Sequence, residues 1–180
     1  MSSRQKMKVK VCLVGDSAVG KTSLIRRFVS NEFDDRHITT MGAKVSKKRI
    51  AVRLEDGSRV EMNMTIWDIM GQKTFRDIMK EAFFYGAQGI LAVCDVTRND
   101  TLHELHGWVK AVYKVSGEVP AYFLANKVDL KDQISFDERE LREVAEKYDA
   151  PYIYTSAKTG ENVQQAFQQL AEMICQMIVA

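Results

Sequence analysis

A chain of 180 residues, 46% of them hydrophobic, has the length of one domain and enough apolar side chains for a sizeable core, which excludes a disordered protein. Its formal net charge of +2 argues against nucleic acid as the main partner, because nucleic-acid-binding domains carry a clustered basic face. No apolar run reaches the roughly 18 residues that span a bilayer. We therefore expect one domain over residues 1–180, with its core in residues 7–178.

The cysteines and the two ends of the sequence bear on the compartment. Cys12, Cys94 and Cys175 form neither a CxxC pair nor a metal-binding spacing, and the first two lie in apolar runs, so we expect buried thiols and a reducing, cytoplasmic environment. Residues 1–4 contain no apolar signal region, and residues 177–180 contain no prenylation box, so the sequence given holds no membrane anchor. A lipidated tail beyond it would place the protein at a membrane surface.

Six segments have the patterns of β-strands. The two that flank Asp56-Gly57 alternate polar and apolar residues, which predicts a hairpin. Residues 89–96 and 121–125 are short continuous apolar runs, typical of parallel strands that are buried on both faces, and residues 7–14 are apolar with lysines interspersed. The expected strands cover residues 7–14, 43–54, 59–67, 89–96, 121–125 and 152–155.

Helical patterns separate these strands. A hydroxyl residue followed three positions later by a glutamate, the capping-box pattern, marks two helix starts, at Thr101 with Glu104 and at Ser135 with Glu138. From about Glu161 a last helix repeats apolar residues at intervals of three and four. The alternation predicts an α/β fold with a six-stranded, mostly parallel sheet, one antiparallel edge strand, and helices on both faces. Ligands of such sheets bind beyond the carboxyl ends of the strands.

A phosphate-binding pattern follows the first strand. Residues 15–22 match GxxxxGK[ST] between a predicted strand and a predicted helix. In such a P-loop the backbone N–H groups face the phosphates, the lysine adds positive charge, and the hydroxyl of Thr22 ligates Mg²⁺. The alternative is a glycine loop that precedes a helix by chance. The expected phosphate contacts are Gly15, Ser17, Ala18, Val19, Gly20, Lys21, Thr22 and Ser23.

Residues 126–129 and 156–158 bear on which base a bound nucleotide would carry. A carboxylate at position 129 can accept bonds from guanine N1 and from the exocyclic amine, and adenine cannot satisfy it. A second loop, after the last strand, fits a contact to the base through its backbone N–H groups. Each segment alone also matches an ordinary surface turn, and their order along the chain favours a guanine site. The expected base contacts are Asn126, Lys127, Asp129, Ser156, Ala157 and Lys158.

The segment after the hairpin carries chemistry as well. Asp68 ends a strand opposite the P-loop, a place suited to holding Mg²⁺ through water, although a lone aspartate there is also typical of a helix cap. Gly71 permits close approach of the backbone to a γ-phosphate. Gln72 is a candidate for orienting the attacking water.

Taken in order, these motifs resemble those of the Ras-superfamily small GTPases, closest to the Rab branch, over residues 7–178. The resemblance implies a P-loop NTPase G domain that binds GTP or GDP with Mg²⁺ and switches between the two states. It implies that Thr40 ligates Mg²⁺ and contacts the γ-phosphate, and that Phe33 packs near guanine; a phenylalanine at the edge of the core is the alternative for Phe33. The implied catalytic residues are Gln72, Lys21 and Thr40, and the implied metal site is Thr22, Thr40 and, through water, Asp68.

The resemblance also implies partners. Effector proteins would bind residues 33–44 (switch I) and 69–84 (switch II), and an exchange factor and a GTPase-activating protein would act on the same segments. Unaided hydrolysis is expected to be slow, with Arg36 as a candidate for neutralising transition-state charge. The competing hypothesis is a scaffold that binds guanine nucleotide with negligible turnover.

The chain departs from the family pattern in switch II. Met70 replaces a small residue beside the γ-phosphate position, and Lys73 replaces a glutamate that in relatives can pair with the P-loop lysine as nucleotide leaves. Since Lys73 would repel Lys21, we expect an unusual switch II and a different route of exchange. The alternative is that both side chains point to solvent. His37 stands where a tyrosine often covers the phosphates.

Overall fold

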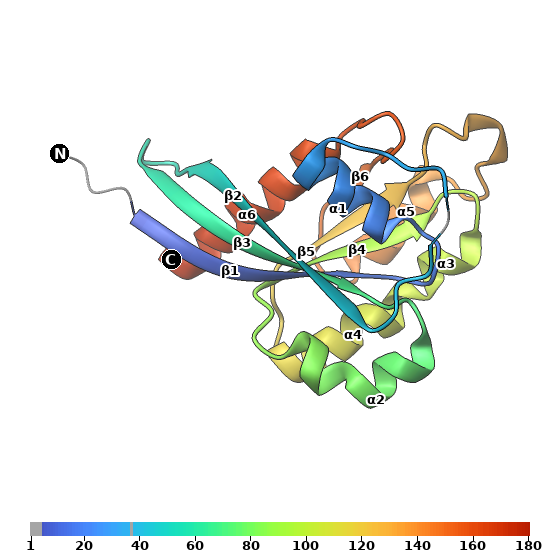
Figure 1. Ribbon diagram of the computed structural model, residues 1–180, viewed down its shortest axis with the longest axis horizontal. Helices are drawn as coiled ribbons and strands as arrows, with labels where there is room; N and C mark the ends of the chain where they lie inside the picture. Colours follow the sequence, from blue (N-terminus) through green and yellow to red (C-terminus); the bar gives the residue numbers. More distant parts are fainter. Residues whose placement is uncertain (1–4, 37) are drawn as a thin grey trace.

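A computed structural model describes residues 5–36 and 38–180; the expectation for His37 lies outside the described residues. Its centre is a six-stranded sheet in the order β2-β3-β1-β4-β5-β6 (Figure 1). β2 pairs antiparallel with β3, and the other neighbouring strands pair in parallel, as predicted. The strands are β1 (Gln5–Val14), β2 (Ala43–Arg53), β3 (Arg59–Ile69), β4 (Gly89–Asp95), β5 (Ala121–Asn126) and β6 (Tyr152–Tyr154).

Helices cover both faces of the sheet, and each face has its own core. On one face Phe28 stacks on Phe167 of the last helix, with ring centroids 4.0 Å apart. On the other face Trp108 and Leu141 are fully buried against the strands. The helices are α1 (Lys21–Ser30), α2 (Lys73–Phe84), α3 (Asn99–His103), α4 (Leu105–Ser116), the 3₁₀ turn η1 (Lys131–Gln133), α5 (Glu138–Glu146) and α6 (Val163–Val179).

The alternation of side chains along β1 explains why the sheet carries two cores. Val9, Val11 and Leu13 belong to the core under α1 and α6, whereas Cys12 and Val14 belong to the core under α4 and α5. Successive side chains of a strand point to opposite faces, so a strand that is apolar at every position is buried on both. The expectation that Cys12 is buried is confirmed, and burial raises the pKa of its thiol to about 12.

Two predicted helix starts are wrong. Thr101 lies inside α3, where its hydroxyl accepts the N–H of Asp95 and donates to the carbonyl of Arg98. Ser135 instead donates its hydroxyl to the carbonyl of Val96, which lies 39 residues earlier in the chain. Bonds to Asp95 and Arg98, in the turn that leads into α3, thus replace the capping bond of Thr101, and a long-range bond replaces that of Ser135.

α5 does begin with a capping box, two residues after the predicted one. Asp137 accepts the N–H of Glu140 at 2.9 Å, and the Glu140 carboxylate accepts the N–H of Asp137 at 3.1 Å. The sequence around this start contains two overlapping capping patterns, and the structure uses the second.

The sheet topology determines where the motifs meet. β1, β3, β4, β5 and β6 run parallel, so the loops that follow them gather at one edge of the sheet. Of the helices in the described part of the chain, none combines the length and apolar character needed to cross a bilayer.

Candidate functional site

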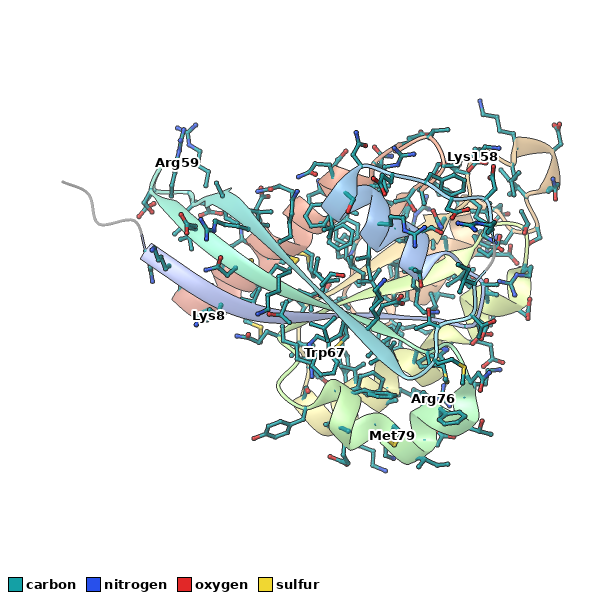
Figure 2. All side chains as sticks on the ribbon, in the orientation of Figure 1. Lys8, Arg59, Trp67, Arg76, Met79 and Lys158 are labelled. Carbon is teal, nitrogen blue, oxygen red and sulfur yellow. The ribbon has the colours of Figure 1, made fainter. Side chains whose placement is uncertain are left out.

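A cavity of about 380 Å³ opens at the edge where the parallel strands end. Figure 2 labels Lys158, which lines this cavity from the loop after β6; Arg76, also labelled, lies on α2 outside the lining. Among the predicted site residues, those that line the cavity are Ser17, Ala18, Gly20, Lys21, Thr22, Ser23, Phe33, Thr40, Gly71, Asn126, Lys127, Asp129, Ala157 and Lys158. Those buried behind the lining are Gly15, Val19, Asp68 and Ser156.

The P-loop lysine lies against the loop that precedes it. The Nζ atom of Lys21 donates to the carbonyl oxygens of Gly15 at 2.7 Å and Asp16 at 2.8 Å. Burial lowers the pKa of Lys21 to about 8, whereas the nearby carboxylates of Asp68 and Asp16 act in the opposite direction. The site therefore holds an ammonium group that gains from the arrival of negative charge.

The remaining carbonyl groups of the P-loop are also bonded to nitrogen donors. In a trans peptide the C=O and N–H bonds point in opposite directions. A carbonyl held from outside the loop therefore turns the N–H of the same peptide toward the cavity. Three bonds of this kind join Arg98 Nη2 to Ser17 O at 3.0 Å, Lys127 Nζ to Ala18 O at 2.7 Å, and Asn126 Nδ2 to Val19 O at 3.0 Å.

Asp95, at the end of β4, connects two of these donors. Its buried Oδ2 atom accepts from Lys127 Nζ at 2.8 Å and from Arg98 Nε at 3.1 Å. Its Oδ1 atom accepts the backbone N–H and the hydroxyl of Thr97. Burial alone would raise the pKa of Asp95, but the bonds from Lys127 and Thr97 outweigh it, and the pKa lies below its ordinary value. Sequence reasoning missed Asp95 and Arg98, although a polar run that directly follows a buried parallel strand is where such residues belong.

Two hydroxyls and a carboxylate meet beside the P-loop. Thr22 Oγ1 lies 2.8 Å from Thr40 Oγ1 and is bonded to Asp68 Oδ2, and Thr40 Oγ1 lies 3.4 Å from the same oxygen. Asp68 is buried, and among the described residues its Oδ1 atom has no hydrogen-bond partner. Burial raises the pKa of Asp68, and the bond from Thr22 and the charge of Lys21 only partly offset this effect. Oxygen ligands and an unsatisfied buried carboxylate fit Mg²⁺.

The backbone of switch II lies very close to the P-loop at Gly71. A Cβ atom on Gly71 would lie 2.6 Å from the backbone carbon of Asp16, so only glycine fits. The hydroxyl of Ser17 donates to the Gly71 carbonyl at 3.0 Å. Gln72, the next residue, is the N-cap of α2 and is exposed; it does not line the cavity.

The two base-recognition loops are bonded to each other. Asn126 Oδ1 accepts the hydroxyl of Thr155 at 3.0 Å and the N–H of Ala157 at 3.3 Å. Ser156 donates its hydroxyl to Asp129 Oδ1 at 2.7 Å. The Asp129 carboxylate is thereby oriented by the loop after β6 and lines the cavity.

Arg27 on α1 supports the second of these loops from behind. Its Nε atom donates to the carbonyl of Ala157 at 2.9 Å, and its Nη2 atom donates to the carbonyl of Lys158 at 2.7 Å. The helical pattern of α1 does not single out this arginine, because its partners lie about 130 residues later in the chain.

Phe33 and Arg36 belong to switch I. Phe33 both lines the cavity and packs against the core under α1 and α6, so the two interpretations of this residue are compatible. Arg36 is mostly exposed and forms a salt bridge of 2.7 Å with Asp34, whose pKa its hydrogen bonds lower to about 2. The Arg36 guanidinium is thus engaged at the rim of the cavity.

Met70 and Lys73, the two residues of switch II that differ from the family pattern, have different environments. Met70 is buried, and its N–H donates to the carbonyl of Gly42 at 2.8 Å. The alternative that both side chains point to solvent is therefore wrong for Met70. Lys73 is exposed, and it bonds to Glu104 at 2.8 Å, which connects the start of α2 to the start of α4.

A second contact between α2 and α4, from Arg76 to Trp108, leads on to the P-loop. Its guanidinium lies 4.9 Å from the centre of the Trp108 ring, within cation–π range. The indole Nε1 of Trp108 donates to Asp16 Oδ1 at 2.9 Å. α2 and the P-loop therefore contact the same side chain of α4.

Comparison with known proteins agrees with this geometry. The family model described as the Ras family matches residues 10–176. Rab-27B of Bos taurus is 36% identical over 173 residues, which cover 92% of this chain and 79% of the relative. Rab-21 of Geodia cydonium is 35% identical, with 93% and 71% covered, and Rab-18-B of Danio rerio is 36% identical, with 93% and 80% covered. The chain belongs to the Ras family of small GTPases. Within that family it is Rab-like.

The low pKa of Lys21 predicts a pH dependence of nucleotide affinity. Phosphate binding favours the charged ammonium, so above pH 8 the free protein must take up a proton to bind. We expect GDP affinity at pH 9 to be on the order of tenfold weaker than at pH 7. Isothermal titration calorimetry at both values measures this change. GMP is the control, because it carries the same base without a β-phosphate; an equal loss for GMP and GDP would show that Lys21 is not the cause.

Proposed function

We propose that the chain is a guanine-nucleotide switch, built as one G domain over residues 1–180 with its core in residues 7–178. It binds GTP or GDP with Mg²⁺ and hydrolyses GTP to GDP and phosphate. The observation that carries this proposal is the bonding of the P-loop carbonyls of Ser17, Ala18 and Val19 to donors from outside the loop, which turns the N–H groups of the same peptides toward one cavity. The oriented carboxylate of Asp129 in the same cavity supports guanine as the base.

In this proposal the phosphates are held by a positive charge and by hydrogen bonds. Lys21 contributes positive charge, and the N–H groups of the P-loop, at the N-terminus of α1, bind phosphate oxygens. Thr22 and Thr40 hold Mg²⁺ directly, and Asp68 holds it through water. When bound, this ion neutralises charge on the phosphate oxygens during transfer. The buried Asp68 oxygen that lacks a partner supports this assignment.

Hydrolysis is phosphoryl transfer to water. The water oxygen bonds to the γ-phosphorus while the bond from phosphorus to the β–γ bridging oxygen breaks, and GDP is released with phosphate. Gln72 orients the water, and Gly71 brings its backbone N–H to the γ-phosphate. Since Arg36 is bound to Asp34, we expect slow turnover until a partner supplies an arginine, which typically adds on the order of 10³–10⁵ in rate.

The output of the switch is a change in the surface that switch I and switch II form. Ile38, Met41 and Ile78 are large apolar side chains that are at least 63% exposed there, which supports effector binding to these segments. Thr40 and Gly71 connect the two segments to the phosphate site. We propose a cytoplasmic protein that meets effectors, an exchange factor and a GTPase-activating protein in trafficking or signalling.

The guanine assignment is tested at Asp129. We expect Asp129→Asn to exchange the preference for GDP for a preference for XDP, because an amide can donate a hydrogen bond to the xanthine oxygen. Competition between the two nucleotides on purified protein measures the preference. Asp132→Asn, the same change at an exposed position in η1, should leave it unaltered. An Asp129→Asn protein that still prefers GDP would contradict the assignment.

Turnover separates the switch from the scaffold hypothesis. Single-turnover phosphate release by the wild-type protein should be slow but complete, and Gln72→Leu should slow it at least about tenfold, because the water loses its orienting group. Gln133→Leu, an exposed glutamine in η1, is the matched control. A wild-type protein that retains GTP without releasing phosphate would establish the scaffold instead.

We propose further that Met70 and Lys73 alter hydrolysis and exchange. Met70→Ala combined with Lys73→Glu should speed both, because space opens beside the γ-phosphate and a carboxylate becomes available to Lys21 as GDP leaves. Met79→Ala with Lys80→Glu changes the same residue types on α2, at positions that do not line the cavity, and should have no effect on either rate. Stopped-flow GDP release and phosphate release are the measurements. Wild-type rates in the Met70→Ala, Lys73→Glu protein would refute the idea.

A further inference from the structure

Ala18 has an unusual backbone conformation in the P-loop. Its φ angle is +64°, in the left-handed region that L-residues rarely adopt because Cβ approaches the backbone carbonyl. A neighbouring peptide that rotated would release this strain. The position therefore needs external contacts that hold the peptide groups on both sides of Ala18.

The structure contains those contacts on both sides. The peptide before Ala18 is held by the bond from Arg98 Nη2 to Ser17 O at 3.0 Å. The peptide after it is held by the bond from Lys127 Nζ to Ala18 O at 2.7 Å. Both donors also bond to the same oxygen of Asp95, at 3.1 and 2.8 Å. One buried carboxylate thus fixes the two cations that immobilise Ala18.

Arg98 is itself held rigidly in the turn between β4 and α3. Its N–H donates to the carbonyl of Asp95 at 3.0 Å, and its carbonyl accepts the hydroxyl of Thr101 at 2.7 Å. The side chain is only partly exposed. A guanidinium on an ordered turn, bonded to a buried carboxylate, loses little further freedom when it holds a carbonyl.

We propose that Arg98 is a positioning residue of the nucleotide site. By holding the carbonyl of Ser17 outward, it keeps the N–H of Ala18 directed at the phosphates. Without this bond the peptide can rotate, which relieves Ala18 and turns a carbonyl oxygen toward negative charge. This inference rests on the proposed binding of guanine nucleotide and adds a residue to that site outside the P-loop and base-recognition motifs.

The test is the dissociation rate of a fluorescent GDP analogue with Mg²⁺. Arg98→Gln should raise this rate about tenfold, which corresponds to about 1.4 kcal/mol. Arg98→Lys should raise it only about threefold, since an ammonium still bonds to a carboxylate and a carbonyl, though without the two-pronged geometry. Arg139→Gln is the matched control, because Arg139 is exposed on α5 and, among the residues that the structure describes, is paired only with Glu143.

Repeating the Arg98→Gln change in an Ala18→Gly protein distinguishes a positioning role of Arg98 from a general contribution to fold stability. In an Ala18→Gly protein the left-handed conformation carries no strain, so Arg98→Gln should raise the GDP release rate by a smaller factor than in the wild-type background. An equal factor in both backgrounds would overturn the positioning role.

The remaining outcomes are also decisive. Tight binding by the wild type with an unchanged rate in Arg98→Gln would overturn the role of Arg98 and leave the proposed function standing. If Arg98→Gln does not fold, an unchanged rate in Arg98→Lys would have the same consequence. A wild-type protein that binds no guanine nucleotide would overturn both.

Discussion

The proposed site depends on the orientation of the peptide groups in the P-loop, whose N–H groups must face the cavity. A loop can present its N–H groups to a phosphate only if its carbonyls point away, and buried carbonyls require donors. Here the donors to the carbonyls of Ser17, Ala18 and Val19 come from two separate parts of the chain: Arg98 after β4, and the pair Asn126 and Lys127 after β5. The proposed phosphate recognition therefore depends on the whole edge of the sheet where the parallel strands end, because the sheet topology brings these donors together there.

The same bonds connect the phosphate site to the base site. Asn126 bonds on one side to the P-loop carbonyl of Val19 and on the other to Thr155 and the N–H of Ala157. A displacement of the P-loop would therefore disturb the loop that orients Asp129. This shared network gives a physical reason why affinity for the phosphates and selectivity for the base should change together.

Switch II is attached to this network at two places of different character. Gly71 contacts the P-loop through its backbone, and α2 contacts α4 through Lys73 with Glu104 and through Arg76 with Trp108. The first contact lies at the proposed γ-phosphate position, and the second lies between α2 and α4. The Lys73–Glu104 pair is exposed, and exposed ion pairs typically contribute only about 0–1 kcal/mol, whereas the Arg76 side chain is largely buried against Trp108.

The sequence by itself determined the strands, the hairpin at Asp56-Gly57 and the phosphate and base motifs, because periodicity and glycine-bearing loops are local patterns. It did not determine that Asp137 rather than Ser135 caps α5, that Met70 is buried, or that Arg98 and Arg27 hold loops far away in the chain. Ser135 is bonded to Val96, and Arg98 to a carbonyl 81 residues earlier. Hydrogen bonds between residues so far apart in the chain produce no pattern of apolar and polar residues in either segment. Only the folded sheet, by placing the strand ends side by side, decides which polar side chain meets which carbonyl.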